Sequence, residues 1–420
     1  MLELKRAELD VAEVKDFMRH IIKNNRLLQA KGKIPLAVEI CGPAGLGKTS
    51  IANQLGEELG LDVVCLSLTQ LGELGDLVGY PLRQFEMSKT KEKRTVKDTD
   101  PTMPARTIIV PLKEPLIEWV DEVALDQYKA EGFTLTGKNR TIDCPPQWIA
   151  GKTKGILLVL DDYTRASQLF IQATMELISR QEYVSWKLPP DSHIILTTNP
   201  SDGEYTVNEL DVAQRTRFIG VNLKWNAERW AEWAERMDVD SRAINFVLQS
   251  PEIVEKEVNP RSLTMFFDAI SSIPDFNEKN ALGLVQMIGE GCVGVTTSTM
   301  FTAFINNRMD KMISPKAMLE TQDLDEVITK LKSSIHPKGE NYRSDIASIL
   351  SMRLLNYSLM LGEKKKVTDF IIKRLIALIT NEQIFTNDIA YVVAKKLIAG
   401  DKTSFQSILV DRNVQTMVTK

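Results

Sequence analysis

Histidine and cysteine are scarce in this chain of 420 residues, which has three histidines and four cysteines. The cysteines are scattered, form no CxxC pair and have no histidine nearby at the spacing of metal ligands. Zinc sites are recognised in a sequence by such pairs. We therefore expect no structural zinc site, and the cysteine usage predicts a reducing, cytoplasmic location.

Long hydrophobic runs and a strong excess of one charge are missing as well. No apolar run approaches the roughly 20 residues that a helix needs to cross a bilayer. Residues 1–20 mix acidic and basic side chains, so we expect neither a signal peptide nor a membrane span. The net charge of −4 argues against a surface coated with basic residues for duplex DNA, but it leaves room for a local basic patch.

The first half of the chain alternates the patterns of strands and helices. A strand, a helix and a second strand in close succession indicate a βαβ unit and hence a parallel sheet. We expect buried strands at Ile34–Cys41, Leu61–Leu68, 155–162 and 193–199, and helices at 2–31, Ser50–Leu59 and Ala166–Arg180. The length of the chain predicts two or three domains.

Residues 83–154 interrupt this alternation and are expected to form an insert. Within it, Glu114–Phe133 predicts a helix and Thr136–Ile149 predicts a loop. The basic run Lys89–Lys97 is compatible with a solvated loop or with a nucleic-acid contact. Trp119 and Trp148 are compatible with packed anchors or with substrate contacts. Beyond about residue 225 the pattern is helical to the end.

A glycine-rich segment follows the first expected strand and fits GxxxxGK[ST] at every fixed position. Glycines let backbone N–H groups converge on phosphate oxygens, and the start of the next helix favours negative charge. Lys48 is expected to reach the β- and γ-phosphates, and Thr49 to ligate Mg²⁺. The alternative is an ordinary glycine-rich turn, but motif and context together favour ATP with Mg²⁺. The residues expected to hold the nucleotide are Gly42, Pro43, Ala44, Gly45, Leu46, Gly47, Lys48, Thr49 and Ser50.

Two carboxylates follow the most apolar expected strand of the chain, Ile156–Leu160. Asp161 is expected to hold Mg²⁺ through its water shell, and Asp162 stands where a general base would polarise the attacking water. The alternative is that both acids cap the next helix. Asn199 ends another apolar strand and can orient the water, unless it only begins a turn before Pro200.

Several short segments resemble one family in their order and spacing. GDLVGYP (Gly75–Pro81), VLDDYTRAS, ISRQEYVSWKLPPDSHIILTTNP, LDVAQRTRF and VNPRSL are similar to motifs of the AAA+ ATPases, and within them of the MoxR-like branch. The second resembles the Walker B element. The third is similar to a helix end, a β-hairpin insert and a sensor strand. The resemblance covers about residues 30–275.

The resemblance implies a role for each matching polar residue. Asn199 corresponds to sensor 1, and Arg261 to sensor 2, contributed by a helical lid. Arg217 corresponds to the arginine finger that reaches the γ-phosphate of a neighbouring subunit, with Arg215 as the fallback. Positioned positive charge is the main catalyst of phosphoryl transfer. Each arginine is also compatible with a solvated surface residue or a salt bridge.

The chain departs from the family pattern at three places. Asp162 stands where the family usually has glutamate, so the water must lie closer, and slow turnover is expected. Thr164 stands where the family usually has asparagine, and the insert at 83–154 is longer than usual. The insert would lie on a ring face or over a pore.

The expected fold class is therefore α/β, an AAA+ parallel-sheet P-loop core with an α-helical lid and an additional C-terminal helical domain. The expected domains are a nucleotide-binding core at 1–224, a lid at 225–312 and a helical domain at 313–420. The last domain is expected to serve oligomerisation or partner docking.

The resemblance implies an ATPase that converts ATP and water to ADP and phosphate. It further implies a homo-oligomer, as a hexameric ring, that remodels or activates a protein partner, either a client or a VWA-type protein. Two other functions stay open, a nucleic-acid motor or loader and a nucleotide-gated scaffold with slow hydrolysis. The net negative charge of the chain argues against the nucleic-acid motor.

Overall fold

The structure is a computed structural model, and it describes residues 6–89, 94–97, 107–110, 115–201, 205–256, 258–276, 280–307, 312–337 and 341–419. The chain divides into two compact units. The α/β unit comprises residues 17–41 and 49–221, and the helical unit comprises the described residues of 1–16, 42–48 and 222–420.

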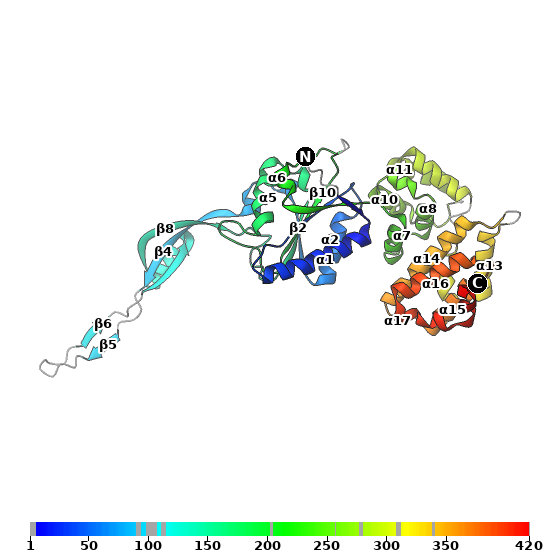
Figure 1. Cartoon of the computed structure of the whole chain (residues 1–420). Coiled ribbons are helices and arrows are strands. Elements are labelled where there is room, and N and C mark those ends of the chain that lie inside the picture. Colours follow the sequence, from blue (N-terminus) through cyan, green and yellow to red (C-terminus); the bar gives the residue numbers. More distant parts are fainter. Residues whose placement is uncertain are drawn as a thin grey trace. The chain divides into compact units, whose positions relative to one another are not determined.

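A parallel sheet forms the centre of the α/β unit (Figure 1). Its strands follow the order β11-β2-β10-β9-β3. The bounds of these strands are β2 (Ala37–Cys41), β3 (Asp62–Ser67), β9 (Ile156–Asp161), β10 (His193–Thr198) and β11 (Phe218–Leu223). Every residue of β2 and β10 is buried, as is usual for parallel strands covered on both faces. The four strands predicted from the sequence are confirmed.

The helices of this unit connect and cover the strands. They are α1 (Val11–Ala30), α2 (Lys48–Leu59), α3 (Gly75–Val78), α4 (Leu125–Ala130), α5 (Gln168–Arg180) and α6 (Val212–Arg215). Four buried side chains of α5 belong to the core beneath the sheet, namely Phe170, Ile171, Leu177 and Ile178. After α5, Tyr183 N–H donates to the Trp186 carbonyl at 2.9 Å inside an antiparallel bridge, so the short hairpin implied by the resemblance is present.

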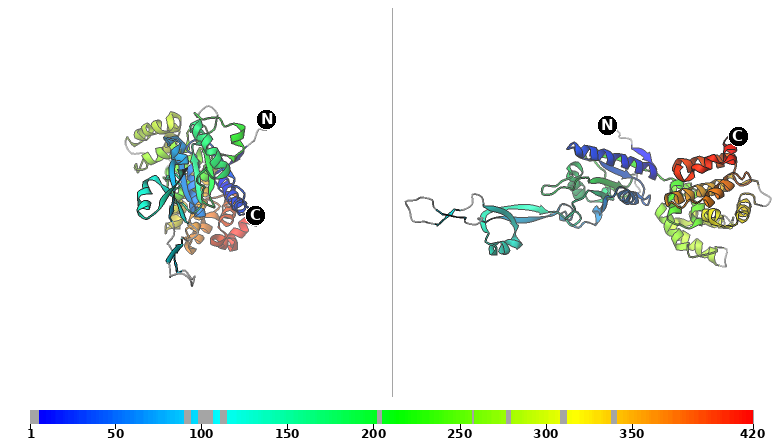
Figure 2. Two further views of the ribbon diagram at one scale, coloured as in Figure 1. Left: turned by 90° about the vertical axis from the view of Figure 1, so that its left-hand side faces the viewer. Right: turned by 90° about the horizontal axis from the view of Figure 1, so that it is seen from below.

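A second, antiparallel sheet occupies the insert, with α4 against it (Figure 2). Its strands are β4 (Tyr80–Lys89), β7 (Leu116–Asp121) and β8 (Thr134–Cys144), in the order β7-β4-β8. The helix predicted over Glu114–Phe133 is therefore wrong for residues 116–121, where β-branched and aromatic side chains alternate between two faces. The loop predicted at Thr136–Ile149 is wrong up to Cys144. Because most of β8 is exposed on both faces, its sequence has no hydrophobic alternation, and only pairing with β4 makes it a strand.

The insert also contains an antiparallel pair, β5 (Arg94–Lys97) with β6 (Thr107–Val110). Most of the basic run Lys89–Lys97 lies outside the residues whose side chains the structure describes. Trp148 packs edge-on against Trp186, with 5.5 Å between ring centroids. Trp119 lies 4.3 Å from the guanidinium of Arg140. Both tryptophans thus make packing contacts within the unit.

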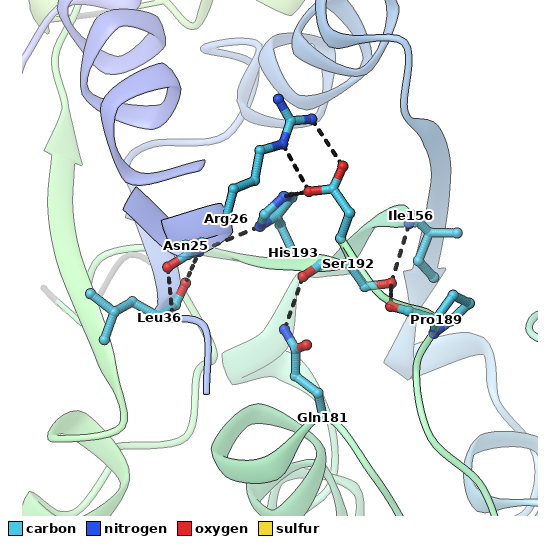
Figure 3. A network of polar contacts seen from close by, with 9 residues as sticks. Asn25, Arg26, Leu36, Ile156, Gln181, Pro189, Ser192 and His193 are labelled. Carbon is cyan, nitrogen blue, oxygen red and sulfur yellow. Dashed lines mark hydrogen bonds and ion pairs between the residues drawn. The ribbon is translucent and has the colours of Figure 1, made fainter. Parts of the chain in front are cut away.

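A polar network fixes α1 to the start of β10 (Figure 3). The Asn25 side chain exchanges two hydrogen bonds with the backbone of Leu36, which fixes its orientation and turns Nδ2 toward His193 Nδ1 at 3.4 Å. His193 Nε2 lies 3.1 Å from Asp191 Oδ1, and Arg26 binds both oxygens of that carboxylate. Burial lowers the pKa of His193 despite the Asp191 charge, so the imidazole is neutral near pH 7.

The helical unit has one continuous apolar core. Its elements are β1 (Ala7–Leu9), α7 (Ala227–Arg236), α8 (Ser241–Gln249), α9 (Glu252–Lys256), α10 (Pro260–Ile270), α11 (Ala281–Asn306), α12 (Pro315–Glu320), α13 (Leu324–Ile335), α14 (Ser344–Glu363), α15 (Asp369–Ile379), α16 (Asn387–Gly400), α17 (Lys402–Phe405) and α18 (Arg412–Thr419). Stacked and edge-on rings around Phe246 and Phe301 form its centre. The core runs from Trp230 to Val414, so it takes side chains from both sides of residue 312.

These elements confirm the expected fold class, a parallel sheet flanked by helices. In the sequence the phosphate-loop motif directly follows the core strand β2, and an all-helical region follows β11. In the described part of the chain, no helix combines the length and the apolar character that a membrane crossing requires.

Candidate functional site

The register of the parallel strands brings the predicted site residues to one edge of the sheet. Cys41 pairs with Thr198, and Leu160 pairs with Leu196. Ser67 pairs with Asp161 on the other side. Because all four strands run in the same direction, the residues that follow them meet at the carboxyl edge, where ligands bind in open α/β sheets.

Asp161 accepts two hydroxyl hydrogen bonds on one oxygen. Thr49 Oγ1 donates to Asp161 Oδ1 at 2.9 Å, and Thr197 Oγ1 donates to the same atom at 2.6 Å. Within the described residues no hydrogen bond reaches Asp161 Oδ2. The structure thus brings together the two residues that the sequence assigns to the metal.

Asp162 occupies the left-handed region, with φ of 50°. Aspartate tolerates this conformation better than most residues. Asn199 Nδ2 donates to Asp162 Oδ1 at 3.2 Å, and Arg165 lies 3.6 Å from the other oxygen. The Asp162 side chain caps no helix, and α5 begins only at Gln168. The geometry therefore speaks against the helix-cap alternative for Asp162 and against a mere turn at Asn199.

The phosphate loop has the backbone that its glycines predict. Gly45 and Gly47 have φ of 82° and 86°, where side chains are rarely tolerated. Lys48 is buried, and its ammonium donates to the carbonyls of Gly42 at 2.6 Å and Pro43 at 3.0 Å. The helix α2 begins at this lysine. The loop can therefore present backbone N–H groups and one cation to an anion.

The start of α10 packs against the phosphate loop within the helical unit. A Cβ at Gly45 would lie 3.0 Å from Arg261 Cβ and 3.0 Å from Asn259 Oδ1. Asn259 caps α10 by accepting from Ser262 N–H at 2.9 Å, with Pro260 in the first turn. The backbone of Arg261 is thereby held beside the loop, and its side chain is exposed.

The two candidate finger arginines stand at the end of α6 and just after it. Arg217 donates from Nε to Ser179 Oγ at 2.9 Å and from Nη1 to the Ala213 carbonyl at 2.7 Å. Arg215 is exposed at the end of α6. None of the hydrogen bonds described for Arg217 involves Asp161 or Asp162.

Sequence reasoning missed Thr197 and Glu39. Thr197 lies in β10 and Asn199 directly follows that strand, two positions further on, and this period-two spacing was the available signal. Glu39 is buried in β2 and accepts from Thr198 Oγ1 at 2.8 Å. A carboxylate inside an apolar strand has no pattern that assigns its role.

The donor set fits a magnesium nucleotide. A threonine hydroxyl and a carboxylate supply hard oxygen ligands, and Mg²⁺ takes one or two protein ligands together with phosphate oxygens and waters. In the described residues no cluster of three or more His, Cys, Asp or Glu side chains offers an all-protein metal site.

Cys65 lies on the neighbouring strand β3. Cys65 is exposed, but partial desolvation and the Asp161 charge raise the pKa of its thiol to about 11.

No family model matches the chain, and no curated protein matches it. Solved structures that match include a mutant of RuvB of Thermotoga maritima, with 13% identity, 97% of this chain and 91% of that chain covered, and a TM-score of 0.29. The RuvB Holliday junction branch migration motor of the same organism matches with 13% identity, 95% and 86% coverage, and a TM-score of 0.29. Since both TM-scores are this low, the fold is established from the strands and helices of this chain alone.

Proposed function

We propose that this protein is an ATPase of the AAA+ type that hydrolyses ATP to ADP and phosphate. The observation that carries the proposal is the joint placement of Thr49 and Asp161, next to Asp162 and Asn199, at the carboxyl edge of the sheet. A complete phosphate-loop motif directly precedes Thr49 in the chain.

Each residue has a physical role in this proposal. The loop N–H groups and Lys48 bind the triphosphate, and Arg261 adds charge from α10. Thr49 and Asp161 would hold Mg²⁺, which neutralises phosphate charge when bound. The carboxylate of Asp162 accepts the proton of the attacking water, and the Asn199 amide orients that water. The Asp162 side chain is short, and its carboxylate already accepts a hydrogen bond from Asn199. We therefore expect slow ATP turnover.

The finer part of the proposal concerns assembly and partners. We infer a homo-oligomeric ring, most simply a hexamer, in which Arg217 completes the site of a neighbouring subunit. Exposure of Arg217 near the end of α6 supports this role. The ring would remodel or activate a protein partner in the manner of MoxR-like proteins, with the core, lid and C-terminal helices divided at residues 224 and 312.

Hydrolysis by an Asp162→Asn variant tests the catalytic assignment. An amide cannot accept a proton, so we expect turnover to fall by about 10²-fold or more while ATP binding persists. Asp126→Asn is the matched control, because Asp126 is an exposed aspartate of α4. Equal turnover in the wild type and in Asp162→Asn would remove Asp162 from the mechanism.

Arg217→Ala, compared with Arg180→Ala, tests the assembly. Both arginines are exposed, Arg180 at the end of α5 and Arg217 in the turn after α6, but only Arg217 is assigned to the adjacent subunit. We expect Arg217→Ala to bind ATP without hydrolysing it, and light scattering to show ATP-favoured oligomers. A monomer with full specific activity, or a rate that depends on added DNA, would contradict the proposed ring and its protein partner.

A further inference from the structure

The hydroxyl of Thr197 links the two carboxylate-bearing residues of the site. Its Oγ1 lies 2.6 Å from Asp161 Oδ1 and 3.0 Å from the backbone nitrogen of Asp162. Thr197 is completely buried in the middle of the parallel sheet, near the end of β10.

The direction of each hydrogen bond is fixed by chemistry. An ionised carboxylate only accepts, and a backbone N–H only donates. The Thr197 proton therefore points to Asp161, and its lone pair receives the Asp162 N–H. For the same reason Thr49 donates to Asp161, which leaves the lone pairs of Thr49 Oγ1 for a metal ion.

The two bonds fix different features of the site. Two donors on Asp161 Oδ1 hold the carboxylate plane, so that Oδ2 keeps one direction. The bond to the Asp162 amide holds that residue in its left-handed conformation, which is unfavourable for a residue with a Cβ. Asn199, which directly follows β10, donates to the Asp162 side chain.

We propose that Thr197 is a positioning residue for magnesium: it orients Asp161 toward the metal and sets the backbone from which Asp162 acts. This inference rests on the proposed ATPase function and assigns a residue that the phosphate-loop and acidic motifs do not contain. Hydrogen-bond partners of metal ligands typically contribute 10–100-fold to metal affinity or activity.

Three variants separate this role from simple packing. Thr197→Val keeps the branched shape and removes the hydroxyl. Thr197→Ser keeps the hydroxyl and removes the methyl group. Thr198→Val is the matched control, because its hydroxyl belongs to the same strand but binds Glu39. Circular dichroism and thermal melting of the full chain establish that each variant is folded.

The primary measurement is the Mg²⁺ dependence of binding of a fluorescent ATP analogue, which requires no turnover. We expect Thr197→Val to need about 10–100-fold more Mg²⁺ than the wild type, with unchanged binding in EDTA. Thr197→Ser and Thr198→Val should follow the wild-type curve. The hydrolysis rate at saturating Mg²⁺ provides the second readout, and it should fall in Thr197→Val alone.

Two results would overturn the inference while leaving the proposed function standing. One is a wild-type Mg²⁺ dependence in folded Thr197→Val. The other is an equal shift in Thr198→Val, which would indicate a general disturbance of β10. A wild-type chain that binds no ATP analogue at any Mg²⁺ concentration would refute the proposed function, and with it the role of Thr197.

Discussion

Removal of Arg353 should strongly destabilise the helical unit, because its charge is completely buried. The guanidinium on α14 donates to Glu235 Oε1 of α7 at 2.5 Å and to Asn245 Oδ1 of α8 at 2.7 Å. Arg353 is 1% exposed and the Glu235 side chain 8% exposed. The pair therefore joins three helices in an environment with little water.

The expected magnitude follows from the burial of both charges. Removing one partner of a buried ion pair costs about 3–5 kcal/mol, because the other charge is left without compensation. We expect this loss for Arg353→Met. Replacing both charges by apolar groups of similar volume is often neutral, so Arg353→Met combined with Glu235→Leu should recover most of the stability.

The loss should also depend on pH. Burial raises the pKa of Glu235 above its usual value of 4.5 although the Arg353 charge opposes this, and loss of that charge should raise it further. A carboxyl whose pKa is higher in the folded than in the unfolded chain binds more protons when folded. Its contribution to the folding stability is therefore fully present below the unfolded pKa and is lost as pH rises through the folded pKa. The penalty of Arg353→Met should therefore grow as the pH rises above the usual glutamate pKa of 4.5.

Urea unfolding followed by helical circular dichroism measures these differences. Arg374→Met is not a suitable control because that arginine is also buried, whereas the exposed Lys373→Met on α15 is suitable. A loss below about 0.5 kcal/mol in Arg353→Met, the usual range of a surface substitution, would refute the reasoning. So would a double variant that is no more stable than the single one.

Two further predictions concern the loop and the His193 network. Gly45→Ala should weaken ATP binding in a calorimetric titration, because the new Cβ would lie 3.0 Å from Arg261 Cβ. Gly151 is the control: its φ is 73°, but no atom lies near the position of a new Cβ, so Gly151→Ala should bind ATP normally. His193 has a pKa below its ordinary 6.5, so its contribution to stability is present above pH 6.5 and is lost as pH falls through the lowered value. Thermal melting of the wild type should show this loss of stability at acidic pH. A His193→Gln variant whose melting temperature falls equally with pH would contradict the prediction.

The sequence predicted the parts of the site that local patterns encode. The phosphate loop combines fixed glycines with a flanking strand and helix, and Asp161 follows an unmistakable apolar run. Asn199 could likewise be predicted as a site residue, because it stands at the end of an apolar run. Asp161 and Asn199 lie at one edge of the sheet because parallel strands end there, which follows from topology once the βαβ pattern is recognised.

Contacts between distant segments could not be predicted. The strand β8 lacks any alternation, since its only reason to be extended is pairing with β4 across about 50 residues of chain. Thr197 looks like an ordinary strand threonine until its register against β9 is known. The burial of Arg353 depends on the packing of α7, α8 and α14, and an arginine in a helical sequence is normally read as exposed.

A calorimetric titration of ATP with Mg²⁺ into the full chain tests the central claim most directly. Lys48→Ala removes the loop cation, and Lys373→Ala removes an exposed lysine of α15 as a control. We predict saturable ATP binding to the wild type and to the Lys373→Ala control. A folded Lys48→Ala variant should bind no ATP. Absence of binding to the wild type, or equal affinity in Lys48→Ala, would contradict the assignment of this loop as the nucleotide site.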